Sequence, residues 1–133
     1  MFHLSNRFLF WAPRALSIAL IAFLSMFAMD VFGENLGFWE TAQALAIHLI
    51  PSIVLIAALI LAWRWEWIGA TLYGAAGLLY FFWVATLSRP VPPAIRIVWV
   101  LGIAGPAFLI AALFLVNWIN RRKQSTPHPP IRS

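Results

Sequence analysis

Residues 42–63 read AQALAIHLIPSIVLIAALILAW and include no charged side chain. A helix rises 1.5 Å per residue, so about 20 residues cross a hydrocarbon layer roughly 30 Å thick. Three more stretches, at 12–32, 68–87 and 94–119, have comparable length and apolar character. The sequence therefore predicts a single transmembrane domain over residues 1–133, with membrane-spanning helices at 12–32, 42–63, 68–87 and 94–119.

The composition of the chain also indicates that lipid is its main solvent. Hydrophobic residues make up 63% of the 133 residues and charged residues only 10%, whereas a soluble domain of this size carries far more surface charge. The chain has no cysteine, which excludes disulfides, thiolate metal sites and a cysteine nucleophile. The sequence also contains no phosphate-binding glycine loop and no hydrolase or zinc-protease motif. We therefore expect neither an enzyme nor a bound cofactor or metal.

Short connections between the four stretches determine the expected topology. Glycines and a glutamate occupy 33–37, only Arg64-Trp65-Glu66 separates the second stretch from the third, and prolines crowd 88–93. Such short connections make consecutive helices antiparallel neighbours. The predicted fold is therefore all-α, an integral membrane four-helix bundle of up-down-up-down topology. The basic and then proline-rich tail at 121–133 is expected to be disordered.

Lysines and arginines are distributed unevenly between the two sides of this predicted bundle. One side holds seven (Arg7, Arg14, Arg64, Arg121, Arg122, Lys123 and Arg132) and the other holds two (Arg89 and Arg96). Under the positive-inside rule this bias places both termini in the cytoplasm. We expect the basic residues to contact the anionic head groups of the lipid bilayer rather than nucleic acid.

Ionisable residues at membrane depth are the natural candidates for a functional site. His48 is about six residues into the second predicted helix, hence about 9 Å below the outer interface. It shares one helical face with Ser52 and Leu55, and we expect this face to point into the bundle. Asp30 and Arg96 lie at similar depth, so the sequence predicts a polar site of Asp30, His48, Ser52 and Arg96. The alternatives are a neutral His48 hydrogen-bonded to a neighbouring helix, and an Asp30 that reaches water.

The segment 62–69 (AWRWEWIG) interleaves three tryptophans with one cation and one anion. Arg64 could lie on an indole face or pair with Glu66, and we interpret the two residues as a rigid clamp at the interface. Tyr73 and Tyr80 lie on the same face of the third predicted helix as Glu66. Buried tyrosine hydroxyls need acceptors, so both are expected to form hydrogen bonds across the bundle. In the fourth helix, Gly105-Pro106 predicts a kink.

Three strings occur in a fixed order in this short chain: LSMFAMDVF at 24–32, HLIPS at 48–52 and AWRWEWIG at 62–69. Together they resemble a family of small, uncharacterised prokaryotic membrane proteins that is catalogued as a domain of unknown function. The resemblance covers the first three predicted helices and, more loosely, the fourth at Asn117-Trp118-Ile119. It implies four membrane-spanning helices in a prokaryotic plasma or inner membrane, and it implies no known activity, substrate or cofactor.

The expected function is that of a non-enzymatic integral membrane protein. Its small-residue helix faces favour association, so it would act as an accessory or interaction subunit whose partner is a second copy or another membrane protein. The alternative is a small dimeric, proton-coupled transporter with a site at Asp30 and His48. Small multidrug exporters have a similar size but carry a glutamate in the middle of the first span, which this chain lacks. A third class is a haem protein in which two chains each supply His48.

Overall fold

The computed structural model describes residues 6–125, and most of them are helical. The elements are α1 (Asn6–Met26), the 3₁₀ helix η1 (Phe27–Gly33), α2 (Phe38–Arg64), α3 (Glu66–Ala85), α4 (Pro93–Trp99), the π-helical turn η2 (Val100–Ala104) and α5 (Gly105–Gln124). Together they form four segments that are long and apolar enough to cross a membrane: Asn6–Gly33, Phe38–Arg64, Glu66–Ala85 and Pro93–Gln124. The four predicted helices are therefore confirmed.

The ends of the segments differ from the prediction mainly on the basic side. The first helix begins at Asn6 rather than at residue 12, and α5 continues to Gln124 rather than ending at residue 119. Residues 121–124 of the tail that was predicted to be disordered are thus helical, and residues 126–133 lie outside the described residues. The basic residues Arg121, Arg122 and Lys123 lie in the last turn of α5, where the helix dipole favours cations.

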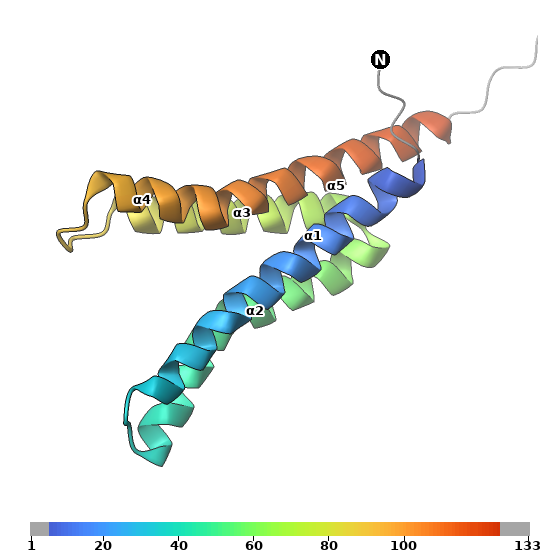
Figure 1. The fold of residues 1–133 in the computed structure, drawn as a ribbon. Helices are drawn as coiled ribbons and strands as arrows, with labels where there is room; N and C mark the ends of the chain where they lie inside the picture. Colours follow the sequence, from blue (N-terminus) through green and yellow to red (C-terminus); the bar gives the residue numbers. More distant parts are fainter. Residues whose placement is uncertain (1–5, 126–133) are drawn as a thin grey trace, which may run out of the picture.

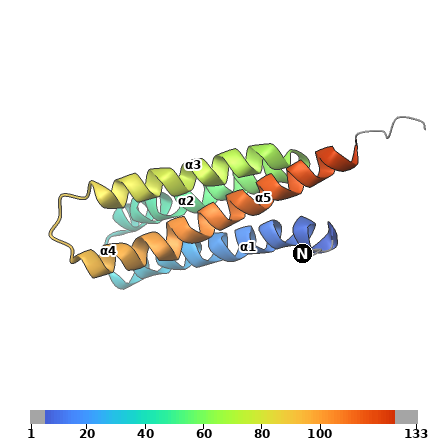
Figure 2. The ribbon, with the colours of Figure 1, turned by 90° about the horizontal axis from the view of Figure 1, so that it is seen from above.

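Consecutive segments run antiparallel, as the short connections require. Helix α1 packs against α2 and α5, and α3 packs against the same two helices. The start of α1, the α2–α3 turn and the end of α5 lie together at one end of the molecule (Figures 1 and 2). We call this the closed end, and we call the end that holds η1 and the α3–α4 connection the open end.

The two hairpins diverge toward the open end, so that the molecule has the shape of a V (Figure 1). Here η1 packs on α1 and α2, whereas α4 packs on α3 and η2. The up-down-up-down order is confirmed, and the two hairpins separate toward the open end (Figure 1). The buried core lies toward the closed end, and its largest members are Leu20, Leu55, Leu59, Tyr73, Ile110 and Phe114.

The irregularity expected at Gly105-Pro106 takes the form of the π-helical turn η2. Proline has no N–H and its ring crowds the preceding turn, which disrupts the ordinary hydrogen-bond ladder. The N–H of Gly105 donates instead to the carbonyl of Val100, five residues earlier. This π-type bond keeps α4 and α5 in one continuous segment.

Gly69 allows three helices to approach closely near the closed end. A Cβ atom at this position would lie 2.5 Å from the Cβ of Ala62 on α2 and 3.0 Å from Cδ2 of Phe114 on α5. The Ala62 Cβ is attached directly to the backbone, so it can move away only if α2 shifts. The absence of a side chain at Gly69 is therefore a requirement of this packing.

We expect Gly69→Ala to lower the free energy of unfolding by about 1–3 kcal/mol, because the added methyl overpacks the contact with Ala62. The measurement is an unfolding titration in mixed detergent micelles. Gly74→Ala is the matched control in the same helix, because its Cβ would meet only the Cβ of Ala111 at 3.8 Å. Equal stability of the two variants would contradict the prediction.

Candidate functional site

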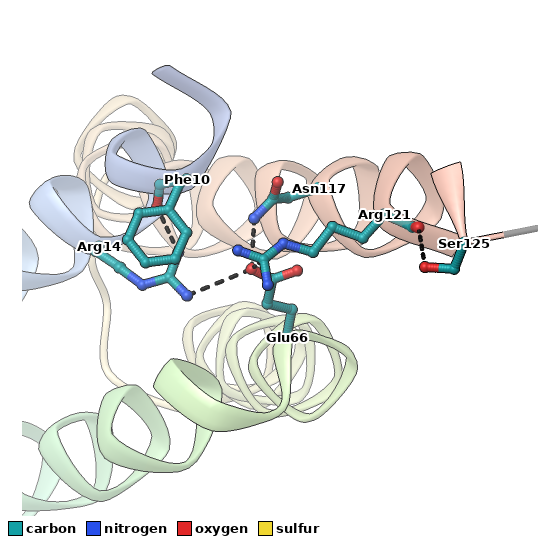
Figure 3. Close-up of polar contacts among 6 residues, drawn as sticks. All are labelled: Phe10, Arg14, Glu66, Asn117, Arg121 and Ser125. Atoms are coloured by element: carbon teal, nitrogen blue, oxygen red, sulfur yellow. Dashed lines mark hydrogen bonds and ion pairs between the residues drawn. The ribbon is translucent and has the colours of Figure 1, made fainter. Parts of the chain in front are cut away.

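A cluster of charged and polar side chains surrounds Glu66 at the closed end. Glu66 opens α3 and is only 5% exposed. Its Oε1 atom lies 3.3 Å from Nη2 of Arg14 and 2.5 Å from Nδ2 of Asn117. The Nε of Arg121 lies 3.6 Å from the same oxygen. One carboxylate oxygen therefore joins α1, α3 and α5 (Figure 3).

Arg14 is the most deeply buried charge of this Glu66 cluster, with no exposed surface. Its guanidinium carbon lies 3.6 Å from the ring centroid of Phe10 and 5.3 Å from that of Trp63. Nη1 donates a hydrogen bond to the carbonyl of Phe10, whereas Nε has no hydrogen-bond partner within residues 6–125. Burial of a cation is costly unless it is paired and hydrogen-bonded, and here Glu66 and the aromatic faces offset that cost.

The positions of Glu66 and Arg121 within their helices favour their charges. Glu66 lies in the first turn of α3, where the helix dipole stabilises an anion. Arg121 lies in the last turn of α5, where the same effect stabilises a cation. Two guanidinium groups and an amide thus surround one carboxylate. Such an arrangement suits the fixing of helices relative to one another rather than proton transfer or nucleophilic attack.

The predicted Arg64–Glu66 clamp does not form. Arg64 is exposed, and its guanidinium carbon lies 5.9 Å from the ring centroid of Trp65. The alternative of an indole contact is therefore the one observed. Glu66 points away from its sequence neighbour because α3 begins at this residue and the side chain is directed between α1 and α5.

The four residues of the predicted polar site do not come together. Asp30 is exposed in η1, and His48 is exposed on α2, where its Nδ1 lies 2.8 Å from the carbonyl oxygen of Ala44. Among residues 6–125, no hydrogen bond or ion pair joins Asp30, His48 or Arg96 to one another. A transport site at Asp30 and His48 consequently has no support within one chain.

His48 is exposed although the next turns of its helical face toward the closed end are buried. Ser52 and Leu55, on the same helical face, are 2% and 5% exposed, so this face does point into the bundle there. One turn closer to the open end, His48 is exposed. The hydroxyl oxygen of Ser52 lies 3.0 Å from that of Ser25 on α1.

Arg96 stabilises the α3–α4 connection through hydrogen bonds to backbone carbonyls. Its Nη2 donates to the carbonyls of Leu87 and Arg89 at 2.9 and 3.1 Å. Its Nη1 lies 3.5 Å from the carbonyl of Ala85 at the end of α3. The last carbonyls of a helix have no partner within the helix. Arg96 supplies a donor for that of Ala85 and for two carbonyls of the connection that follows.

The two tyrosines predicted to bond across the bundle differ. Tyr73 is fully buried and its hydroxyl donates to the carbonyl of Leu55 on α2 at 3.2 Å. Tyr80 lies two turns closer to the open end, with its ring centroid 5.7 Å from that of Trp83. Its hydroxyl makes no hydrogen bond to the part of the chain that the structure describes. The prediction thus holds for Tyr73 and is wrong for Tyr80.

An apolar cavity of about 490 Å³ lies between the diverging hairpins. Leu24, Pro51 and Val54 line it from the α1–α2 hairpin, and Ala76, Tyr80 and Trp83 line it from α3. Neither this cavity nor the Glu66 cluster holds a metal-binding set, because the described residues contain no group of three or more His, Cys, Asp or Glu side chains that could bind a metal ion.

Sequence reasoning missed Arg14, Asn117 and Arg121 as site residues. A usable signal was present, because Arg14 falls inside the first apolar stretch and a cation there needs a partner. Glu66 is the acidic residue on the same side of the predicted bundle. The pairing of Arg14 with Glu66 could therefore have been proposed from their opposite charges and from their position on the same side of the predicted bundle.

A protein-family model matches most of the chain. The family model described as Domain of unknown function (DUF7670) matches residues 2–126. No curated protein and no solved structure matches the chain. The expectation of a family of unknown function is thereby confirmed.

Proposed function

The chain belongs to the family described as Domain of unknown function (DUF7670), so we infer its function from its own residues. We propose that it is a multi-pass integral membrane protein. In this proposal it acts without catalysis, as an accessory or interaction subunit. Large apolar side chains on three of the four segments support membrane insertion. Ile60, Leu79 and Leu101 are 66%, 73% and 66% exposed. Soluble monomers rarely expose apolar surface on this scale.

The charge distribution supports an orientation with both termini in the cytoplasm of a prokaryotic cell. Arg7, Arg64, Arg122 and Lys123 belong to the closed end, whereas Arg89 and Arg96 belong to the open end. Positive charge is retained on the cytoplasmic side of membranes, and anionic head groups attract it there. The bilayer, and not nucleic acid, is then the partner of these cations.

The observation that carries the interaction role is the uncovered imidazole of His48. The residue is about 15 Å along α2 from Phe38, and α2 has 27 residues, so His48 lies within the hydrocarbon if α2 spans it. A carbonyl can only accept, so Nδ1 carries the proton toward Ala44, and Nε2 of the neutral ring is an acceptor. Polar groups at this depth rarely face lipid. A second polypeptide that offers a donor to Nε2 would cover it.

Single introduced cysteines test the proposed contact between His48 and a second polypeptide. Any crosslink must come from the introduced cysteine, because the chain has no cysteine of its own. Ala44→Cys lies beside His48 on the same face of α2, and Ala46→Cys lies on the opposite face. With a short photo-crosslinker in native membranes, we expect Ala44→Cys to form an adduct with one protein, a second copy or another membrane subunit. Ala46→Cys should form about fivefold less.

A second variant tests whether His48 itself holds the partner. Adding His48→Leu to Ala44→Cys should lower the adduct yield about fivefold, as expected for the loss of one buried hydrogen bond. Thermal stability of the isolated chain should stay unchanged, because His48 is exposed. Equal adduct yields from positions 44 and 46, or no effect of His48→Leu, would count against the interaction role.

A further inference from the structure

The apolar cavity between the hairpins has the features of a ligand site. Its volume of about 490 Å³ falls within the usual range of about 300–1,000 Å³ for small-molecule pockets. The lining residues Val54 and Leu79 are 56% and 73% exposed, so the cavity opens sideways to the exterior of the molecule. Along α3 it extends from Ala76 to Trp83, which is about 10 Å at 1.5 Å per residue.

The size and chemistry of the cavity select its occupant. Its lining, which comes entirely from described residues, includes no charged side chain, so the cavity suits an apolar occupant. In a bilayer, into which the proposed function places the chain, acyl chains are present at this depth on every side.

The hydroxyl of Tyr80 adds one polar requirement. It makes no hydrogen bond within residues 6–125, in contrast to Tyr73, whose hydroxyl donates to Leu55. An unpaired hydroxyl is costly in hydrocarbon. Tyr80 is about 8 Å from the end of α3 at the open end, the side from which the ester groups of a lipid would enter. A lipid ester carbonyl is an acceptor for this donor.

We propose that the cavity binds one acyl chain of an ester-linked phospholipid, whose ester carbonyl accepts a hydrogen bond from Tyr80. This site is separate from the contact at His48, which does not line the cavity. The Glu66 cluster lies at the closed end of the molecule, away from the opening of the cavity, and holds the two hairpins together there.

Two neighbouring substitutions on α2 test the proposal. Val54→Trp places an indole into the cavity, whereas Ile53, which is 59% exposed and does not line the cavity, provides the matched control Ile53→Trp. The proteins are exchanged into nanodiscs of phosphatidylethanolamine and phosphatidylglycerol, released into mild detergent and examined by native mass spectrometry. We expect one retained phospholipid on the parent protein and on Ile53→Trp. Val54→Trp should retain about tenfold less.

If Val54→Trp does not fold, a second pair on α3 provides the same comparison of lipid retention. Leu79→Trp is then the cavity variant and Leu78→Trp its control. Leu79 lines the cavity and Leu78 does not, and both are exposed. Equal retention within both pairs would overturn the proposal. A dimer that Val54→Trp dissociates, without retained lipid on the parent, would also overturn it, because a second chain would then fill the cavity.

The proposed hydrogen bond from Tyr80 to the lipid ester carbonyl is tested by a separate measurement. Tyr80→Phe should lower retention of the ester lipid about fivefold, as expected for one hydrogen bond. A diether phospholipid with the same chains has no ester carbonyl, so it should bind the parent and Tyr80→Phe equally. Loss of both lipids to the same extent in Tyr80→Phe would overturn the assignment of the hydroxyl to the ester.

Discussion

Glu66→Ala is expected to lower the free energy of unfolding by about 3–5 kcal/mol, because it leaves the fully buried guanidinium of Arg14 without its anion. Asn117 and Arg121 lose their shared acceptor at the same time. The remaining partners of Arg14 are the Phe10 carbonyl and the neighbouring aromatic rings. They cannot neutralise its charge, so the desolvation cost stays uncompensated.

The measurement is an unfolding titration in mixed micelles, followed by the helical signal. Glu34→Ala is a suitable control, since Glu34 is an exposed acid near the open end and exposed charges contribute little. Glu66→Gln keeps a carbonyl oxygen as acceptor and should fall between the two. A Glu66→Ala variant within about 0.5 kcal/mol of the control, the range usual for surface substitutions, would contradict the role assigned to the cluster.

Arg14→Met is expected to destabilise the protein by about 2–4 kcal/mol, less than Glu66→Ala because Glu66 keeps Asn117 and Arg121 as partners. Methionine retains most of the apolar stem that packs near Phe10 and Trp63. What is lost is the ion pair across α1 and α3 together with the cation–aromatic contacts. Arg7→Met, at an exposed position on α1, is the control and should change stability little.

The double variant Arg14→Met/Glu66→Gln separates the ion pair from the general cost of substitution. Breaking a buried pair from one side leaves a charge, whereas removing both charges leaves none. The double variant should therefore be more stable than the sum of the single effects by at least about 1 kcal/mol. Simple additivity in the same titration would show that Arg14 and Glu66 are not coupled.

The helices and their order could be predicted in advance because they depend on local properties. Length and apolarity alone select the four segments, and a one-residue turn at Trp65 forces α2 and α3 to be antiparallel. The position of Pro106 likewise anticipates the irregularity at η2, since the missing N–H is a property of the residue itself. Helix ends were harder, because polar residues such as Asn6 and Gln124 continue a helix that packing has already formed.

The candidate site was predicted only in part. Asp30 and His48 were placed together because they lie at similar depth in the predicted helices. Both belong to the α1–α2 hairpin, but both side chains are exposed, since depth alone does not determine which way a side chain points. Tyr73 lies where the helices touch and bonds as expected, whereas Tyr80 lies beside the cavity and does not.

The amino-acid sequence alone thus establishes four apolar helices, their alternating direction and the concentration of positive charge on one side. These properties follow from side-chain hydropathy and chain connectivity, which need no knowledge of distant contacts. The partner of Glu66 and the cavity beside Val54 depend on how far apart the two hairpins lie. That separation results from packing between residues far apart in the chain, such as Gly69 against Ala62 and Phe114. An apolar helix face can contact lipid or protein equally well, so the sequence pattern does not predict how far apart the hairpins lie.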